Sequence, residues 1–247
     1  MGLGDWIMAT GEAKAHHART GRRVCFSNGG KHYWSEVFDG NPKLARAPGE
    51  GIDILRQGGG MRPYISLKTR GAWTWKQYQP IPGEAYFTDR ELEFGSRFRG
   101  RIIVEPNCKP IGHMNKDWGR PRWSELIKLL RDLPLAQLIA PGQMFLPGIE
   151  QIGTETFRSA WAVLKYARAA VLPEGGLHHA AAAVGLPAVV IYGGFISPQV
   201  TGYALHRNIY TGGSPLGCGM RTNCAHCKEA MATITPERIA KELRSLL

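Results

Sequence analysis

Short apolar runs alternate with amphipathic segments along the second half of the chain, and this pattern predicts its secondary structure. Apolar stretches of strand length bounded by Gly, Pro or polar residues predict buried strands over residues 101–105, 135–140 and 169–172, and a further one between Pro187 and Gly193. The intervening segments predict helices over residues 121–133 and 156–167, a short alanine-rich helix after Gly176, and a closing helix after Thr235-Pro236-Glu237.

The first half of the chain has a less regular pattern. It predicts a helix over residues 6–19, a strand near 23–27 and short strands at 52–55 and 64–67, separated by connections rich in glycine and proline. An aromatic and basic stretch follows over residues 70–82.

Strands that alternate with helices predict an α/β fold with a mostly parallel sheet covered on both faces. Ligands of such sheets usually bind beyond the carboxyl ends of the strands. A boundary near residues 97–100 divides the chain into two predicted lobes, 1–99 and 100–247.

Composition narrows the classes of protein. The 247 residues carry a formal net charge of +11, spread over both halves, so the partner is expected to be acidic: nucleotides, lipid phosphates and nucleic acid all qualify, while a separate basic nucleic-acid tail is absent. The five cysteines are an odd number and argue against a secreted disulfide scaffold. No apolar run approaches the roughly 20 residues that span a bilayer, and no signal-like segment opens the chain, so a cytoplasmic protein is expected.

The turn Glu174-Gly175-Gly176-Leu177-His178-His179 lies between a buried strand and the alanine-rich helix. Free backbone amides and the helix dipole favour negative charge there, which suits a phosphorylated ligand. A purely structural strand-to-helix turn is the alternative interpretation.

Three segments, in this order, resemble the ADP-heptose:lipopolysaccharide heptosyltransferases, glycosyltransferase family 9. They are Gly2-Leu3-Gly4-Asp5, similar to the family's Gly-x-Gly-Asp turn; Asn115-Lys116-Asp117-Trp118, similar to its Lys-x-Trp loop; and the turn at Glu174, similar to its Asp-(Ser/Thr)-Gly-x-x-His-x-x-Ala motif. The tail from Met231 also looks like the family's closing helix. Residues 100–247 are covered well by the resemblance and residues 11–99 poorly.

The resemblance implies a GT-B-like fold, with two Rossmann-like lobes with parallel sheets, the first lobe being reduced. It implies a metal-independent, inverting transfer of a heptose-like sugar from a nucleotide-diphospho-sugar, with an ADP-sugar favoured and no cofactor required. Asp5 matches the catalytic base, with Gly4 on the acceptor side. The residues implied to bind the donor are Lys116, Glu174, Gly175, Gly176 and His179. Spacing alone favours an ordinary helix N-cap for Asp5 and a solvated lysine for Lys116; the other two motifs favour the functional interpretation.

Two departures from the family's pattern affect these expectations. Family members begin with a strand before the first turn, whereas this chain starts on the turn, so we expect either a truncated start or a reduced first lobe. Glu174 replaces the usual Asp and Gly175 the usual Ser or Thr, which removes one hydroxyl contact to the donor.

The cysteines Cys218, Cys224 and Cys227 suggest a metal knuckle, with His226 between the last two. Only the Cys-x-x-Cys pair has familiar ligand spacing and no fourth ligand is evident, so reduced buried thiols are favoured over zinc.

The acceptor is open from the sequence. A saccharide such as phosphorylated lipopolysaccharide core would explain the positive charge, and peripheral membrane association stays open with it. Trp73 and Trp75, which lie among basic residues, are candidates to stack on an acceptor sugar or on a base. The alternatives are a phage-type transferase acting on a hydroxymethylated base in DNA, which requires base extrusion, and a nucleotide-sugar-binding protein without catalysis.

Overall fold

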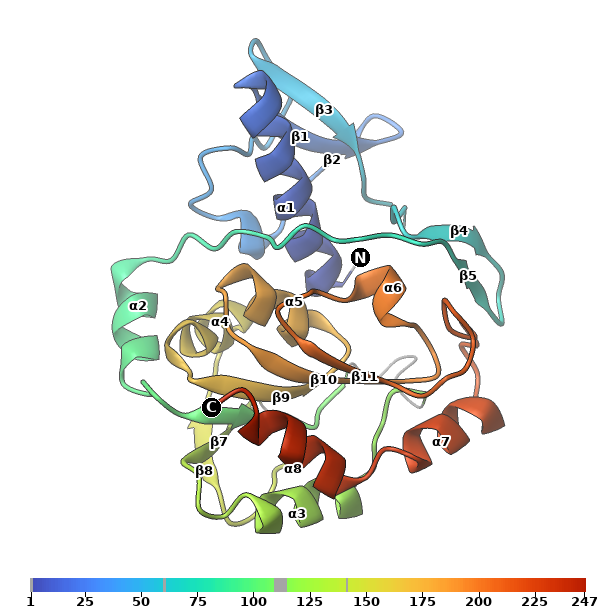
Figure 1. Ribbon diagram of the computed structural model, residues 1–247. Helices are drawn as coiled ribbons and strands as arrows, with labels where there is room; N and C mark the ends of the chain where they lie inside the picture. The colour runs from blue at the N-terminus through green and yellow to red at the C-terminus, as the bar shows by residue number, and fades with distance from the viewer. Residues whose placement is uncertain (1, 60, 109–114, 141) are drawn as a thin grey trace.

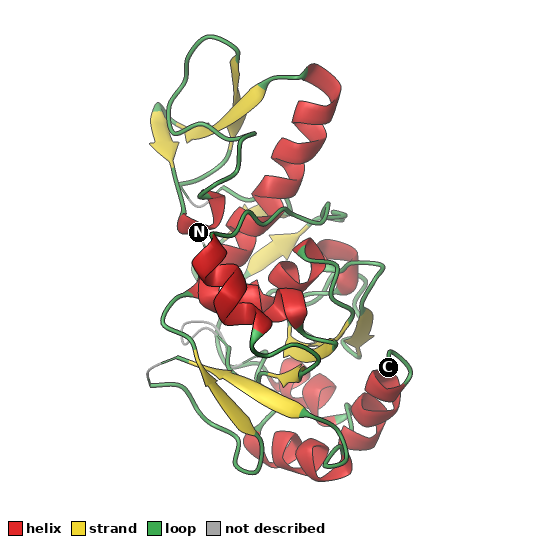
Figure 2. Ribbon diagram, turned by 90° about the vertical axis from the view of Figure 1, so that its left-hand side faces the viewer, coloured by secondary structure: helices red, strands yellow, loops and turns green. Residues whose placement is uncertain are grey.

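Three β-sheets organise the structure, a computed structural model that describes residues 2–59, 61–108, 115–140 and 142–247. A six-stranded sheet has the order β11-β10-β9-β6-β7-β8, a three-stranded sheet has the order β2-β1-β3, and β4 pairs with β5. Figure 2 shows the two larger sheets at opposite ends of the molecule, with a long helix beside the smaller one. We refer to the elements from α1 to β5 as the first lobe and to those from β6 to α8 as the second.

The six-stranded sheet is parallel at every pairing. Its strands, in chain order, are β6 (Ile102–Val104), β7 (Leu135–Ile139), β8 (Glu150–Gly153), β9 (Ala169–Pro173), β10 (Ala188–Gly193) and β11 (Arg207–Tyr210). The parallel sheet predicted from the sequence is therefore confirmed. Its edge strands β8 and β11 were not predicted, because each has only one buried residue and no apolar run marks it.

Helices cover both faces of this sheet. One face carries α3 (Arg120–Leu129) and α8 (Pro236–Arg244), and the other carries α4 (Phe157–Tyr166) and α5 (Gly176–Ala183). In β9, Ala169 and Val171 pack toward the first pair of helices, while Ala170 and Leu172 pack toward the second. The apolar run of β9 follows from this double burial.

The first lobe is small. Its elements are α1 (Leu3–Thr20), β1 (Arg23–Asn28), β2 (Lys31–Tyr33), the 3₁₀ turn η1 (Glu36–Phe38), β3 (Ile52–Arg56), β4 (Ile65–Lys68) and β5 (Trp73–Trp75). The predicted helix and the three predicted strands of this half are confirmed, with ends shifted by a few residues. An extended segment then crosses between the lobes to α2 (Asp89–Ser96), which packs against α4 (Figure 1).

A single apolar cluster joins the two lobes. It runs from Trp6 of α1 and Phe26 of β1, through the interface, to Trp161 of α4 and to Leu172 and Val190 of the large sheet. The apolar residues of the first lobe therefore share one core with α4, α5 and the large sheet of the second lobe. The division at residues 99 and 100 stays a prediction.

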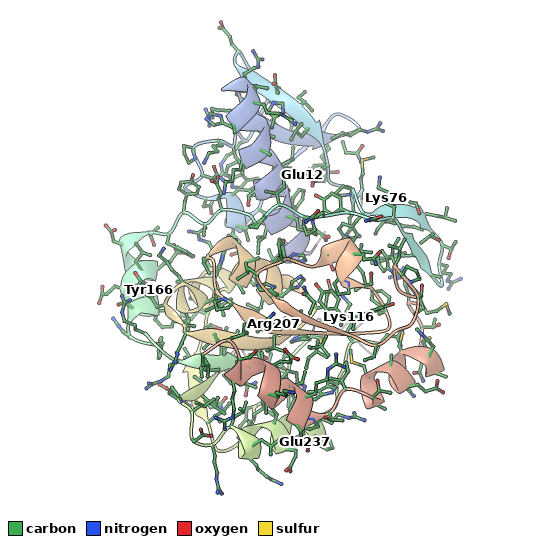
Figure 3. The ribbon with its side chains drawn as sticks, viewed as in Figure 1. Glu12, Lys76, Lys116, Tyr166, Arg207 and Glu237 are labelled. Carbon is green, nitrogen blue, oxygen red and sulfur yellow. The ribbon has the colours of Figure 1, made fainter. Side chains whose placement is uncertain are left out.

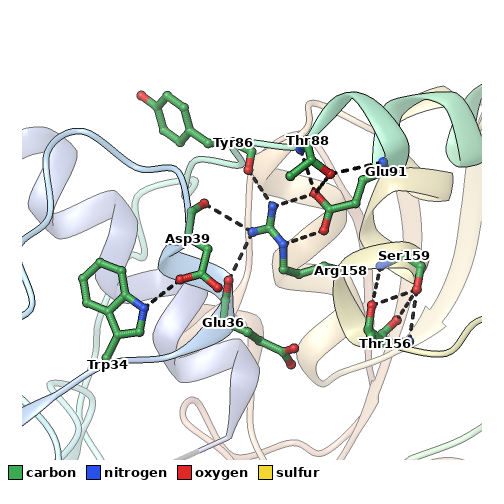
Figure 4. A network of polar contacts seen from close by, with 9 residues as sticks. All are labelled: Trp34, Glu36, Asp39, Tyr86, Thr88, Glu91, Thr156, Arg158 and Ser159. Carbon is green, nitrogen blue, oxygen red and sulfur yellow. Dashed lines mark hydrogen bonds and ion pairs between the residues drawn. The ribbon is translucent and has the colours of Figure 1, made fainter.

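A buried arginine adds a polar connection at the same junction (Figure 4). Arg158 of α4 is 7% exposed and makes two hydrogen bonds to the Glu91 carboxylate, at 2.7 and 2.8 Å. It also donates to the carbonyls of Glu36, Asp39 and Tyr86. A hollow of about 690 Å³ lies beside this network, and none of the site residues predicted from the sequence lines it. We therefore read this hollow as part of the lobe junction.

No helix among the described residues is long and apolar enough to cross a bilayer.

Candidate active site

The predicted turn at Glu174 lies where β9 ends and α5 begins. Gly175 is the N-cap of α5, and its N–H donates to His178 Nδ1 at 3.0 Å. His178 Nδ1 is also 2.7 Å from the Gly175 carbonyl, and Nε2 is 2.9 Å from the Thr201 carbonyl; a neutral ring whose Nδ1 accepts the Gly175 N–H carries its proton on Nε2 and donates it to Thr201. Burial lowers the pKa of His178, although the Glu174 charge opposes this, so its ring is neutral. His178 is thus a support of the turn, and the Gly175 amide is already used.

The next amides of the turn are free. Within the described part of the chain, no group accepts a hydrogen bond from the N–H of Gly176, Leu177 or His178. These are the orphan donors that every helix N-terminus carries, and they add to the positive end of the helix dipole.

The N-terminus of α1 meets that of α5 at this point. A Cβ built on Gly4 would lie 2.7 Å from Cδ2 of His179 and 3.1 Å from Cα of Gly176. Only glycine allows the two first turns to come this close. Gly4, expected on the acceptor side, therefore has a packing reason to be glycine, and two positive helix ends converge on one place.

Asp5 occupies the third position of α1 and lies at this convergence. Its Oδ2 accepts the N–H of Gly2 at 2.8 Å, so the carboxylate closes the helix end from inside the first turn and is not the N-cap residue itself. Its Oδ1 accepts the Arg62 Nε–H at 2.8 Å and the Tyr64 hydroxyl. The carboxylate is 9% exposed.

The partners of Asp5 are held in defined protonation states. Burial opposes the charge of Arg62, but the Asp5 carboxylate outweighs it and raises the pKa of Arg62. Burial, together with the Asp5 charge, raises the pKa of Tyr64 well above its usual value. The phenol therefore keeps its proton and donates it toward Asp5.

Lys116 and Glu174 form an ion pair on the second-lobe side of the site. Glu174 is 5% exposed, and burial alone would raise the pKa of its carboxyl; the Lys116 charge outweighs burial and lowers it. Lys116 also lies over the Phe195 ring, with Nζ 5.1 Å from the centroid. Figure 3 labels Lys116, which lies inside the second lobe below α1.

His179 is buried against α1, and its Nδ1 is 2.8 Å from the Tyr203 hydroxyl. Burial, followed by the neighbouring His178, lowers the pKa of His179 well below its usual value. Its Nε2 has no hydrogen-bond partner among the described residues, so a neutral His179 can offer one N–H to a ligand.

Glu174, His178 and His179 have ligand atoms within 4.8 Å of one another, a spacing that a metal ion could use. Their bonding argues against it. Lys116 neutralises Glu174, and both nitrogens of His178 are taken up by backbone groups.

The two tryptophans of the hairpin differ. Trp75 is 5% exposed and its indole N–H donates to the Phe195 carbonyl at 2.9 Å, so it is a contact between the lobes and offers no open face. Trp73 is partly exposed, and two guanidinium groups lie near its ring, Arg62 at 5.1 Å and Arg221 at 4.8 Å from the centroid. Of the pair, Trp73 keeps the geometry of a stacking residue.

Cys218, Cys224 and Cys227 come together, as their spacing suggested, and His226 joins them. Sequence reasoning missed His226 as a fourth partner. It also missed Arg62, Tyr64 and Tyr203, which lie in loops without a motif and reach the site only through the fold.

Comparison with known proteins bears on the fold. No protein-family model and no curated sequence matches this chain. The family 9 glycosyl transferase from Veillonella parvula DSM 2008 superposes over 100% of this chain and 94% of its own, with a TM-score of 0.65 and 12% identity. The iron-containing dodecameric glycosyltransferase TibC from enterotoxigenic E. coli H10407 superposes over 100% of this chain and 74% of its own, with a TM-score of 0.62 and 15% identity.

The match to E. coli ADP-heptose lps heptosyltransferase II covers 68% of this chain but only 55% of that protein, at 21% identity and a TM-score of 0.49. The fold expected from the motifs is confirmed: this chain has the GT-B-like fold of family 9 glycosyltransferases. The expectation of a parallel sheet in the first lobe is wrong, since β1 pairs parallel with β3 but antiparallel with β2, and β4 pairs antiparallel with β5.

Proposed function

We propose that this protein is a metal-independent, inverting glycosyltransferase that moves a sugar from a nucleotide-diphospho-sugar to an acceptor hydroxyl. The observation that carries the proposal is the position of Asp5. A first-lobe carboxylate lies where the first turn of α1 meets that of α5, and α5 directly follows Glu174, which is paired with Lys116.

The donor diphosphate binds at the second-lobe side of this junction. The free amides of Gly176, Leu177 and His178 point at its oxygens, and His179 adds one N–H. Lys116 turns from Glu174 to the diphosphate and supplies a compact positive charge. Glu174, released from Lys116, accepts hydrogen bonds from the hydroxyls of the donor.

In the reaction, the acceptor oxygen attacks the anomeric carbon on the face opposite the diphosphate. Its proton passes to Asp5, the new glycosidic bond forms, and the bond from the anomeric carbon to the phosphate oxygen breaks with its electron pair on the diphosphate. Lys116 and the helix amides stabilise the charge that builds there, in place of a metal ion. The acceptor hydroxyl takes the place on Oδ1 that Tyr64 now holds.

The acceptor is proposed to be a saccharide with anionic groups. Trp73 is partly exposed and has Arg62 and Arg221 near its ring, so a sugar that stacks on the exposed part of the ring would bring a phosphate or carboxylate close to a guanidinium. The motif resemblance favours an ADP-sugar donor and a lipopolysaccharide-like acceptor. Duplex DNA competing with the saccharide, with a steep loss of binding in salt, would contradict this choice.

Asp5→Asn tests the assignment. We expect release of nucleoside diphosphate in the presence of acceptor to fall roughly 10²- to 10⁴-fold, since a positioned base contributes about that much. Donor affinity, measured by calorimetry, stays within about threefold because the diphosphate contacts lie in the second lobe.

Asp132→Asn is the matched control, since Asp132 is also paired with an arginine, Arg244, but is 56% exposed and is not part of the site. It should leave turnover unchanged. Full turnover by Asp5→Asn with an intact fold would refute the assignment.

A second function, a nucleotide-sugar-binding protein without catalysis, is favoured by one observation. Both oxygens of the Asp5 carboxylate are already engaged, by Gly2, Arg62 and Tyr64. Donor binding by the wild type without transfer or hydrolysis of any ADP-, UDP- or GDP-sugar would select this function over the enzyme.

A further inference from the structure

Four side chains with metal-binding atoms converge away from the site described above. Cys218 lies in the loop after β11, Cys224 is the N-cap of α7 (Ala225–Ala232), and His226 and Cys227 lie in the first turn of that helix. Their three sulfurs and one imidazole nitrogen all lie within 4.8 Å of one another.

The hydrogen bond of His226 leaves Nδ1 as the nitrogen that could bind a metal. Its Nε2 is 2.6 Å from the Gly212 carbonyl, which can only accept, so Nε2 carries the proton and Nδ1 has a free lone pair. A ligating histidine commonly donates its other ring N–H to a backbone carbonyl, which fixes the tautomer and the ring.

The separation of two of the sulfurs is too long for a disulfide, and both cysteines are free. Sγ of Cys218 and Sγ of Cys227 are 3.1 Å apart. A disulfide measures about 2.05 Å, and two thiolates on one tetrahedral zinc lie about 3.8 Å apart, from Zn–S bonds of about 2.3 Å. The two sulfurs would therefore have to move apart by about 0.7 Å to bind one zinc ion.

Burial does not account for the cluster either. Cys227 is buried, but Cys218 and Cys224 are only partly buried and His226 is exposed; Cys25, in β1, is also buried and joins no such cluster among the described residues. Cys25 has the environment of a thiol that only packs.

We propose that Cys218, Cys224, Cys227 and Nδ1 of His226 bind one zinc ion. Three thiolates and one imidazole complete a tetrahedron and leave no open position, so the ion is structural and takes no part in sugar transfer. This site goes beyond the proposed function and does not depend on it.

The loop between the first two ligands contacts both sides of the candidate active site. Asn115, the neighbour of Lys116, donates to the carbonyls of Met220 and Thr222 at 2.6 and 2.8 Å, and its Oδ1 accepts the Cys224 N–H at 3.2 Å. The zinc would thereby hold the segment that carries Lys116.

The same loop holds the hairpin of β4 and β5. The backbone N–H of Trp73 donates to the Gly219 carbonyl at 3.0 Å, and the backbone N–H of Arg221 donates to the Gly71 carbonyl at 2.9 Å. One ion would then order a donor-side lysine and an acceptor-side tryptophan together.

The test is metal content. The full chain, purified under reducing conditions from a zinc-containing medium, should carry about one zinc per chain by plasma mass spectrometry. Cys224→Ser and His226→Ala, at positions not fully buried, should each carry less than about one fifth of that, and Cys25→Ala should keep it. Cobalt added to the apoprotein should show the absorption of a tetrahedral thiolate complex.

Removing zinc with a chelator should increase hydrogen exchange at residues 71–75 and 115–117 while the strands β6, β9 and β10 keep their protection. The proposal fails if the wild type holds less than about one tenth of an equivalent of zinc and takes up none when it is added. It also fails if mass spectrometry finds a Cys218–Cys227 disulfide, or if iron fills the site in place of zinc. None of these readouts requires sugar transfer.

Discussion

The two lobes differ in how each completes its core. In the second lobe, strands such as β9 and β10 are buried along their whole length between two layers of helices. In the first lobe, β3 has no fully buried residue, β2 is exposed along most of its length, and the apolar side of α1 packs onto α5. The second lobe surrounds its own sheet, whereas the first depends on its partner. The candidate active site forms at the place of that dependence.

Because the lobes differ in this way, substitutions in them should affect unfolding differently. A change inside the second lobe should unfold the whole molecule, because both apolar clusters include its sheet. A change at the junction should loosen the first lobe first. Four substitutions test this difference between the lobes.

The largest effect is expected from Lys116→Met. It leaves the buried Glu174 carboxylate without its cation, which should lower the free energy of unfolding by about 3–5 kcal/mol. Chemical denaturation at pH 7 measures it, and Lys128→Met, at an exposed pair with Glu125, should cost less than about 0.5 kcal/mol.

The pH dependence gives the sign of the Lys116 effect. In the wild type the pKa of Glu174 lies below its ordinary value of 4.5, so its contribution is present above about that pH and is lost on acidification. Without Lys116, burial raises that pKa, so Lys116→Met should become more stable as the pH falls. Adding Glu174→Gln to Lys116→Met should recover most of the loss.

Glu105 is the next largest case. It follows β6, is 2% exposed, and burial raises its pKa to about 7, although hydrogen bonds from Asn107 oppose this. An acid whose folded pKa is raised adds stability at low pH and loses it between about 4.5 and about 7. Glu105→Gln should therefore be more stable than the wild type at pH 8, by on the order of 3 kcal/mol, and nearly equal at pH 4. Equal stability of Glu105→Gln and the wild type at both pH 4 and pH 8 would mean that burial does not raise the pKa of Glu105.

Arg158→Met breaks the junction directly. It removes the two bonds to Glu91 and leaves the carbonyls of Glu36, Asp39 and Tyr86 without this donor, so we expect a loss of about 2–3 kcal/mol. Hydrogen exchange should increase in α1 and β1 before it increases in β9. Arg97→Met, at an exposed pair with Glu93, is the control and should change neither. An equal increase of hydrogen exchange in both lobes would contradict the dependence of the first lobe on the second.

Gly4→Ala gives the smallest effect, about 1–3 kcal/mol, because the methyl group would meet His179 and force the first turns of α1 and α5 apart. Gly153→Ala, where a Cβ meets nothing within 4 Å, should be neutral. Thermal unfolding measures both. Donor affinity should fall with Gly4→Ala alone, because the methyl group would displace His179 and the first turn of α5, which carry the proposed diphosphate contacts.

Most strands of the second lobe could be predicted from the sequence. Its apolar runs marked β6, β7, β9 and β10, because strands buried on both faces need continuous apolar residues. It also marked the turn at Glu174, since paired glycines and an acid at a strand-to-helix junction have few structural uses. No such pattern marks the edge strands β8 and β11 or the helices α2 and α7, because these elements are largely exposed and combine polar residues with a few buried ones.

The tertiary structure alone decided how the site is put together. The motifs predicted that Asp5 and Glu174 both matter, but only the packing of α1 on α5 brings two helix ends and a carboxylate to one place. Arg62 and Tyr64 reach Asp5 from a loop some sixty residues away, and His226 joins three cysteines through the turn of one helix. Periodicity records which side of an element is buried, whereas contacts between distant segments depend on how whole elements pack, and a single sequence holds no local record of that.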